Sequence, residues 1–135
     1  MSRPREQVIW DFVRDWLRKA EGDLHAAGHL LITDLEDYFA AAFHAQQAAE
    51  KFLKAVLVRH QIPFPKTHDI EHLLRLVSPA EPSLAQELAS AHILTPFGVE
   101  FRYPGEQTAK LETAQEALEE ANRVKEAVLL SLIHI

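Results

Sequence analysis

Apolar residues recur every three or four positions through most of this chain of 135 residues. Because an α-helix has about 3.6 residues per turn, this spacing gathers apolar side chains on one helical face. The clearest stripe comprises Trp10, Val13, Leu17, Ala20, Leu24, Ala27 and Leu31. The apolar–polar alternation of strands is nearly absent, and the length suits one domain. We therefore predict an all-α protein whose single domain covers residues 1–135.

The stops and starts of the periodic pattern divide the chain into an antiparallel up-and-down bundle of four main helices plus one short helix. Pro63 and Pro65 end one long helix, and Thr67 is a candidate N-cap for the next. That helix ends before Pro79, and a loop is expected over 95–105. The other helices are expected over 4–31, 36–59, 82–92 and 108–130.

Composition excludes several classes of protein. The net charge of −6 comes from 14 basic and 20 acidic residues, whereas non-specific duplex binders are usually basic. There is no Cys, so disulfides and thiolate metal sites are excluded. No apolar run reaches the roughly 18 residues of a membrane span, and the first residues lack a signal-peptide core. We expect a cytoplasmic protein without a cofactor or a membrane partner.

A cationic group of residues is the strongest candidate for a binding site. The start of the third helix would offer free backbone N–H groups to an anion, nearby cations would add charge, and Tyr103 or Phe64 could stack on a base. An ordinary alternative is that the lysines are solvated and that Arg102 pairs with Glu50 or Glu106. The candidate nucleotide- or phosphate-binding residues are Lys51, Lys54, Lys66, His68, Arg102 and Tyr103.

Other chemistry has less support in the sequence. His68 and His72 have the i, i+4 spacing of some metal ligands, but no third ligand is marked and the intervening residues do not match the zinc-protease pattern. We predict no metal site and no catalytic residue. Two aromatic residues off the main stripe, Phe12 and Trp16, are candidates for a dimer contact. Residues 130–135 resemble a translated sequencing adapter, so they are either the native end of the chain or a non-native tail.

Three segments, in this order, resemble the family of HEPN-domain proteins. They are Gln46–Ala55, Lys66–Ile70 with the following Leu73-Leu74, and Arg102–Gly105. The resemblance covers nearly the whole chain and implies a helical bundle that forms a homodimer. It also implies a partner, a minimal nucleotidyltransferase encoded next to it, in a toxin–antitoxin-like module.

The ribonuclease members of that family carry an Arg followed four to six residues later by His, near the start of the last helix. Their composite dimer site cuts RNA without a metal. In this chain no His follows Arg102 at that spacing. The pair Arg18 and His25 comes close to it but lies in the first helix, where both are expected on the surface.

The sequence therefore favours a non-catalytic protein that binds a nucleotide, RNA or a protein partner. Two alternatives stay open. One is a metal-independent endoribonuclease in which Arg102 acts with a displaced His such as His68. The other is a structural adaptor without a ligand.

Overall fold

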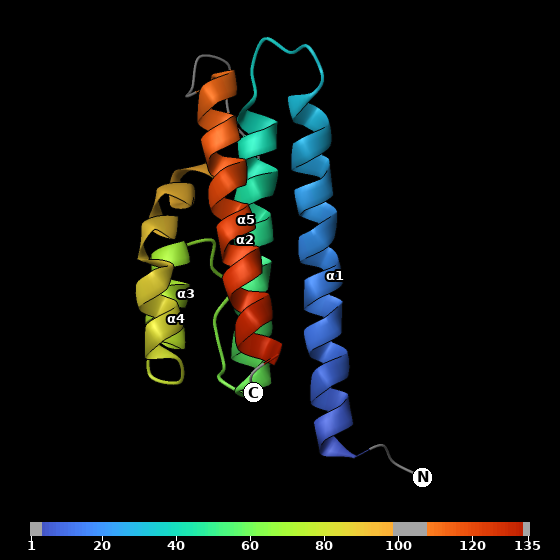
Figure 1. Cartoon of the computed structure of the whole chain (residues 1–135), viewed down its shortest axis with the longest axis vertical. Coiled ribbons are helices and arrows are strands. Elements are labelled where there is room, and N and C mark those ends of the chain that lie inside the picture. Colours follow the sequence, from blue (N-terminus) through green and yellow to red (C-terminus); the bar gives the residue numbers. More distant parts are fainter. Residues whose placement is uncertain (1–3, 99–107, 134–135) are drawn as a thin grey trace.

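The computed structural model describes residues 4–98 and 108–133, and within them every regular element is helical. The predicted all-α class is therefore confirmed. Three long α-helices and three shorter elements, the last of them a 3-10 helix (η1), make up the fold (Figure 1). In chain order they are α1 (Arg5–Leu31), α2 (Phe39–Arg59), α3 (Ile70–Val77), α4 (Pro82–Glu87), η1 (Ala89–Phe97) and α5 (Leu111–Ile133).

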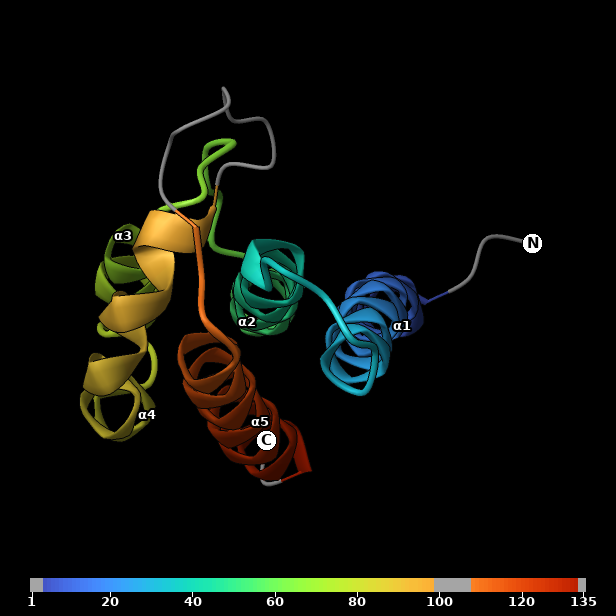
Figure 2. The same ribbon diagram turned by 90° about the horizontal axis from the view of Figure 1, so that it is seen from above.

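Helix α2 lies at the centre of the bundle. Seen from above, α1 packs on one side of it, α5 on a second side, and α3 with η1 on a third (Figure 2). Its Ala-rich first half lets the neighbouring helices approach closely, and its second half supplies the large core residues Phe52, Leu53 and Leu57. All three are fully buried.

The connection between α2 and α3 determines where the candidate site forms. Helix α2 ends at Arg59, yet the main-chain oxygen of His68 accepts a hydrogen bond from Gln46, near the middle of α2. The segment 60–69 therefore runs back along α2 before α3 begins. As a result α3 runs in the same direction as α2. Helix α5 also runs in this direction, and α1 runs in the opposite one (Figure 1).

For α2 and α3, a side chain explains why the helix begins later than the sequence predicts. Helix α2 begins at Phe39 rather than 36, because the Asp37 carboxylate accepts from the N–H groups of Phe39 and Ala109. For α3 the N-cap is Asp69, whose carboxylate accepts from the His72 N–H, and not Thr67. The Thr67 hydroxyl accepts instead from the Asp69 N–H.

The region after α3 also differs from its predicted bounds. The helix expected over 82–92 ends at Glu87, and the chain continues as η1 through Phe97, where a loop was expected from 95. The last helix begins and ends three residues later than its predicted span 108–130, and Leu132 is buried within it. Among the described helices, none is both long enough and apolar enough to cross a bilayer.

Candidate functional site

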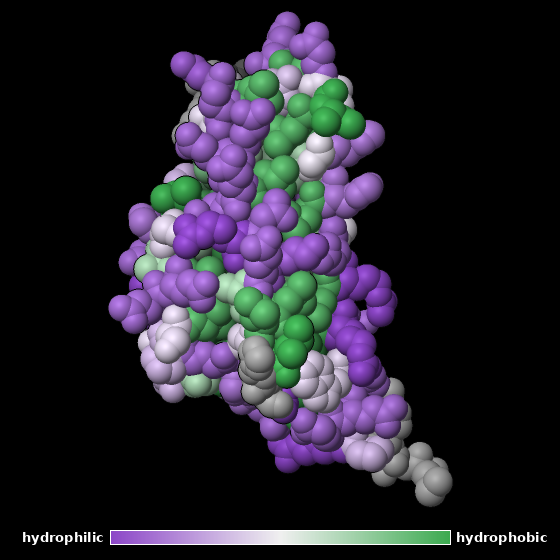
Figure 3. Space-filling view, in the orientation of Figure 1, coloured by the Kyte–Doolittle hydropathy of each residue, from purple (hydrophilic) through white to green (hydrophobic). Residues whose placement is uncertain are grey.

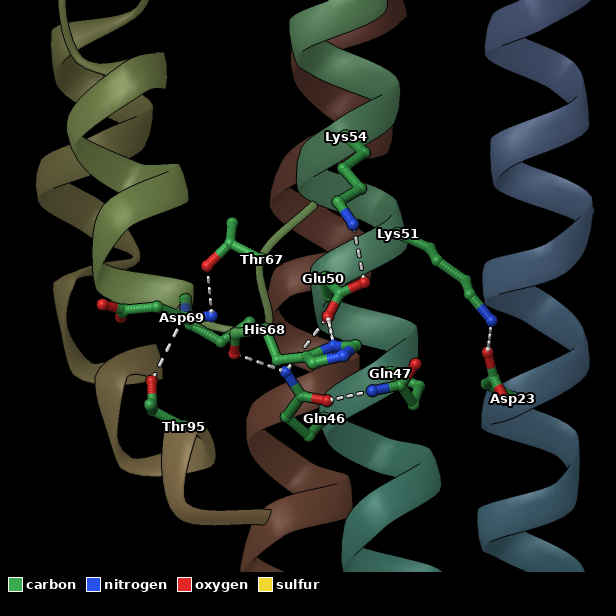
Figure 4. Close-up of polar contacts among 11 residues, drawn as sticks. Asp23, Gln46, Gln47, Glu50, Lys51, Lys54, Thr67, His68, Asp69 and Thr95 are labelled. Atoms are coloured by element: carbon green, nitrogen blue, oxygen red, sulfur yellow. Dashed lines mark hydrogen bonds and ion pairs between the residues drawn. The ribbon is translucent and has the colours of Figure 1, made fainter. Parts of the chain in front are cut away.

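A buried carboxylate, that of Glu50, organises the polar interior of the bundle. Glu50 lies on α2 and is only 3% exposed. One carboxylate oxygen accepts from Lys54 Nζ at 2.8 Å, and the other lies 2.7 Å from His68 Nδ1 (Figure 4). The Gln46 amide approaches that second oxygen at 3.4 Å. A buried charge is tolerated only where such partners compensate it, so these residues form one unit, here called the Glu50 cluster: Gln46, Glu50, Lys54 and His68.

His68 joins this cluster from the returning segment 60–69. Its main-chain oxygen accepts from the Gln46 amide at 2.9 Å, and its ring nitrogen is held by Glu50. Behind it lies the buried Gly98, where an added Cβ would come within 2.9 Å of the His68 Cβ. The His68 side chain is nevertheless 61% exposed. The imidazole is therefore fixed on its inner side and open to solvent on its outer side.

Lys54 is a component of the core and not a free surface cation. The residue is 7% exposed. Besides its bond to Glu50, its ammonium lies 5.6 Å from the ring centroid of Trp16 on α1 and 5.7 Å from that of Phe64 in the returning segment. The two rings meet edge to face with 6.1 Å between centroids. These cation–π contacts extend the Glu50 cluster to α1 and keep Lys54 from reaching a ligand.

Lys51 belongs to a second polar group on the α1 side of α2. Its ammonium binds the Asp23 carboxylate, which lies 2.9 Å from His44 Nδ1 as well. Figure 4 shows Lys51 directed towards α1 and Lys54 directed towards Glu50. A hydrogen bond of 2.6 Å from Gln47 to Gln46 lies between the two groups. The two lysines therefore neutralise different acids and do not form one cationic surface.

The six residues proposed from the sequence have four different outcomes. Lys54 and His68 meet at Glu50, whereas Lys51 is turned away to Asp23. Lys66 is exposed, and the described part of the chain gives it no ion pair. The remaining two, Arg102 and Tyr103, lie outside the described residues.

The expected anion site at the start of α3 needs a correction. We expected free backbone N–H groups there, but the Ile70 N–H donates to the Thr95 hydroxyl and the His72 N–H donates to Asp69. These two N–H groups already have acceptors and are not free for an anion. Charge at this corner would have to come from Lys66 and its neighbours and not from the helix terminus.

Sequence reasoning did not place the two acids at the centre of these groups: Glu50 was considered only as a partner of Arg102, and Asp23 was not considered. A signal for Glu50 was present, because it precedes Lys54 by four residues within an Ala-rich apolar run. For Asp23 there was no such signal, since its partners His44 and Lys51 lie on another helix. Of the two aromatic candidates for a dimer contact, Trp16 packs on Phe64, and Phe12 is 56% exposed.

The protein is thus an all-α bundle with a polar cluster between α2 and the segment that leads into α3. The family model described as "HEPN domain" matches residues 13–131, so the chain belongs to the HEPN-domain family. The chain is similar to a solved structure, the crystal structure of TT1696 from Thermus thermophilus. The two are 34% identical, with a TM-score of 0.70, over 86% of this chain and 94% of that one. No curated protein matches the chain.

Replacing Glu50 by Ala should destabilise the fold by about 3–5 kcal/mol, because it leaves the Lys54 ammonium buried without its acid. The free energy of unfolding from urea titration measures this effect. The matched control is Asp15→Ala, which removes the acid of an exposed pair with Arg18 and should cost less than about 1 kcal/mol. Equal losses for the two variants would show that the Glu50 cluster contributes no more than a surface ion pair.

Proposed function

We propose that this protein is a non-catalytic HEPN protein that binds RNA or a nucleotide on the surface around His68. The observation that supports the proposal is the exposed imidazole of His68, which is held in place by the buried Glu50. Lys66 lies two residues before it, exposed and without an ion pair to a described residue. Arg102 lies outside the described residues, and we propose that it contributes to the same site because it follows Gly98, which packs on His68, by four positions in the sequence.

The charges of the described residues limit how this surface can attract a ligand. Lys51 and Lys54 each pair with an acid, so neither adds net positive charge. Lys66 and Arg102 are then the cations that contact phosphate, while Lys54 supports the site from within. Tyr103 is proposed to stack on a base, because aromatic rings bind unpaired bases with little sequence preference.

A metal-independent endoribonuclease is the second candidate function, and one contact favours it. A carboxylate that holds one ring nitrogen of an exposed His is an arrangement suited to proton transfer, with the carboxylate orienting the ring. Glu50 and His68 have that arrangement at 2.7 Å. In this candidate Arg102 stabilises the charge on the phosphate while His68 moves the proton.

One experiment separates the two functions. Short single-stranded RNA, and ATP in parallel, are titrated with the full chain in EDTA at low salt, and the RNA is afterwards run on a denaturing gel. We expect binding with intact RNA. The double variant Lys66→Ala with Arg102→Ala should weaken RNA binding about tenfold or more and reduce its salt slope by about 0.7 for each phosphate that is no longer neutralised.

The charge-matched control is Arg18→Ala with Lys110→Ala, which removes one Arg and one Lys that are exposed elsewhere. It should bind as the wild type does. RNA cleavage that His68→Ala abolishes would establish the second candidate in place of the first. If the wild type binds neither RNA nor ATP, or if the Lys66 and Arg102 variant binds unchanged, the proposed site is wrong.

We further propose that the protein forms a homodimer through the junction of α1 and α5. Apolar residues form a band between these two helices on the face seen in Figure 3. Within it lies a groove of about 450 Å³, which includes Trp10, Leu17 and Leu129 in its lining. A second copy is the proposed occupant because the family forms dimers, and because Ile133, which is exposed at the edge of the groove that it helps to line, could contact the same groove of a two-fold partner.

The variant Leu129→Glu should convert this dimer to a monomer, because it places a charge in the apolar groove. Sedimentation velocity measures the mass in solution, and circular dichroism checks that the helix content is retained. Ile32→Glu is the control, since Ile32 is 82% exposed and does not line the groove. A wild type that sediments as a monomer, or a Leu129→Glu variant that sediments as a dimer, contradicts this interface.

A minimal nucleotidyltransferase encoded next to this chain is the proposed protein partner, in a toxin–antitoxin-like module. Membership of the HEPN-domain family supports this pairing. The exposed Lys66, with Arg102, would contact an acidic edge of that partner, which would make RNA and the enzyme compete for one surface.

Co-expression of the two chains should give a complex of fixed stoichiometry by size-exclusion chromatography with light scattering. The variant Lys66→Ala with Arg102→Ala should elute separately from the enzyme, and the Arg18 and Lys110 control should not. A complex that forms without any binding of RNA or ATP would instead identify the protein as a structural adaptor. Separate elution of the two wild-type chains would remove the pairing.

A further inference from the structure

The contacts of His68 determine which of its ring nitrogens carries a proton. Nδ1 lies 2.7 Å from one oxygen of Glu50, and the other oxygen accepts from the Lys54 ammonium at 2.8 Å. A carboxylate paired in this way with an ammonium is ionised, and an ionised carboxylate has acceptor atoms only. The His68 Nδ1 must therefore donate its proton to Glu50, and Nε2 is left on the other side of the ring.

The charge of the Glu50 cluster indicates the state of that second nitrogen. Lys54 already compensates Glu50 in the protein interior, so that carboxylate needs no second cation. A neutral imidazole with its proton on Nδ1 presents a lone pair at Nε2. No described residue donates a hydrogen bond to this atom, and the side chain is 61% exposed. The open edge of His68 is thus an acceptor without a donor among the described residues.

The position of the ring is built into the fold. Gln46 is completely buried and holds the His68 main chain at 2.9 Å, while Gly98 leaves just the space that the His68 Cβ occupies. The lone pair therefore has a fixed place beside the returning segment that carries Lys66. A site of this kind selects among ligands by hydrogen bonding, because an unmatched partner cannot form the bond.

An acceptor discriminates between the groups of a nucleic acid. Phosphate diester oxygens carry no proton to donate, so they do not match the Nε2 lone pair. The ribose 2′-hydroxyl is a donor, and it is absent from DNA. Amino groups of the bases are also donors, but RNA and DNA share them. A preference for RNA over DNA of the same sequence is therefore the property that this lone pair would produce.

We propose that Glu50 is a positioning residue, which fixes His68 with its Nε2 lone pair towards the ligand, and that this atom accepts a hydrogen bond from a ribose 2′-hydroxyl. The site then takes single-stranded RNA in preference to single-stranded DNA. This inference rests on the proposed function, because it concerns the same surface around His68. It adds the class of sugar that the surface recognises.

The first measurement needs no ligand. The ring ¹⁵N chemical shifts of His68 in the full chain report its tautomer, and we expect the proton on Nδ1. The double variant Glu50→Leu with Lys54→Met removes the acid together with its buried partner, a replacement that proteins often tolerate. It should shift the ring towards a mixture of tautomers. A wild-type His68 with its proton mainly on Nε2 would overturn the inference.

The second measurement compares a short oligoribonucleotide with the deoxyribonucleotide of the same sequence, thymine replacing uracil. Wild type should bind RNA about tenfold more tightly, as expected for one matched hydrogen bond. His68→Leu should abolish this ratio by weakening RNA binding alone, and the Glu50 and Lys54 variant should reduce it. The control His72→Leu removes a His on α3 outside the Glu50 cluster and should keep the ratio.

The outcomes distinguish the inference from the function on which it rests. Equal affinities of the wild type for RNA and DNA, or an unchanged ratio in His68→Leu, would overturn ribose recognition and leave nucleic-acid binding intact. Binding of neither oligonucleotide would overturn both. Because His68→Leu leaves the buried Glu50 paired with Lys54, it keeps the test decisive even if the Glu50 and Lys54 variant fails to fold.

Discussion

The compensation of one buried negative charge is the constraint on which this structure depends. Glu50 lies within the central helix, where an unpaired carboxylate would be strongly unfavourable. Its partners come from α2 itself and from the returning segment, and Lys54 extends the contacts to Trp16 on α1. Satisfying Glu50 therefore requires the returning segment to lie along α2, and it fixes the one imidazole on which the proposed function is built.

Much of the fold could be predicted from the sequence because helical periodicity is a local property. The stripe through Val13 and Leu24 identified α1, and the family resemblance drawn from the sequence was correct. The bounds that failed did so for two kinds of reason: α3 begins late because of a local cap by Asp69, whereas the start of α2 depends on a distant residue. Helix α2 begins at Phe39 because Asp37 also binds the Ala109 N–H, a contact across 72 residues that no local pattern contains.

The candidate site was predicted only in part, and for a physical reason. Residue type singled out Lys54 and His68, but spacing along a helix does not say whether a cation will meet a ligand or an acid of its own chain. The structure pairs Lys51 with Asp23 and Lys54 with Glu50. What the sequence suggested as a cationic pocket is, in its described part, a buried pair of Glu50 and Lys54 that holds the exposed imidazole of His68, with Lys66 as the exposed cation beside it.

The return of segment 60–69 along α2 also bears on how the molecule folds. The contacts of His68 with Glu50 and Gln46 join residues only 18 and 22 positions apart. Closing so short a loop has a small entropic penalty compared with the 72 residues between Asp37 and Ala109, and local contacts favour rapid folding. The Glu50 cluster therefore lies in a region that can assemble early, before α5 docks and completes the bundle.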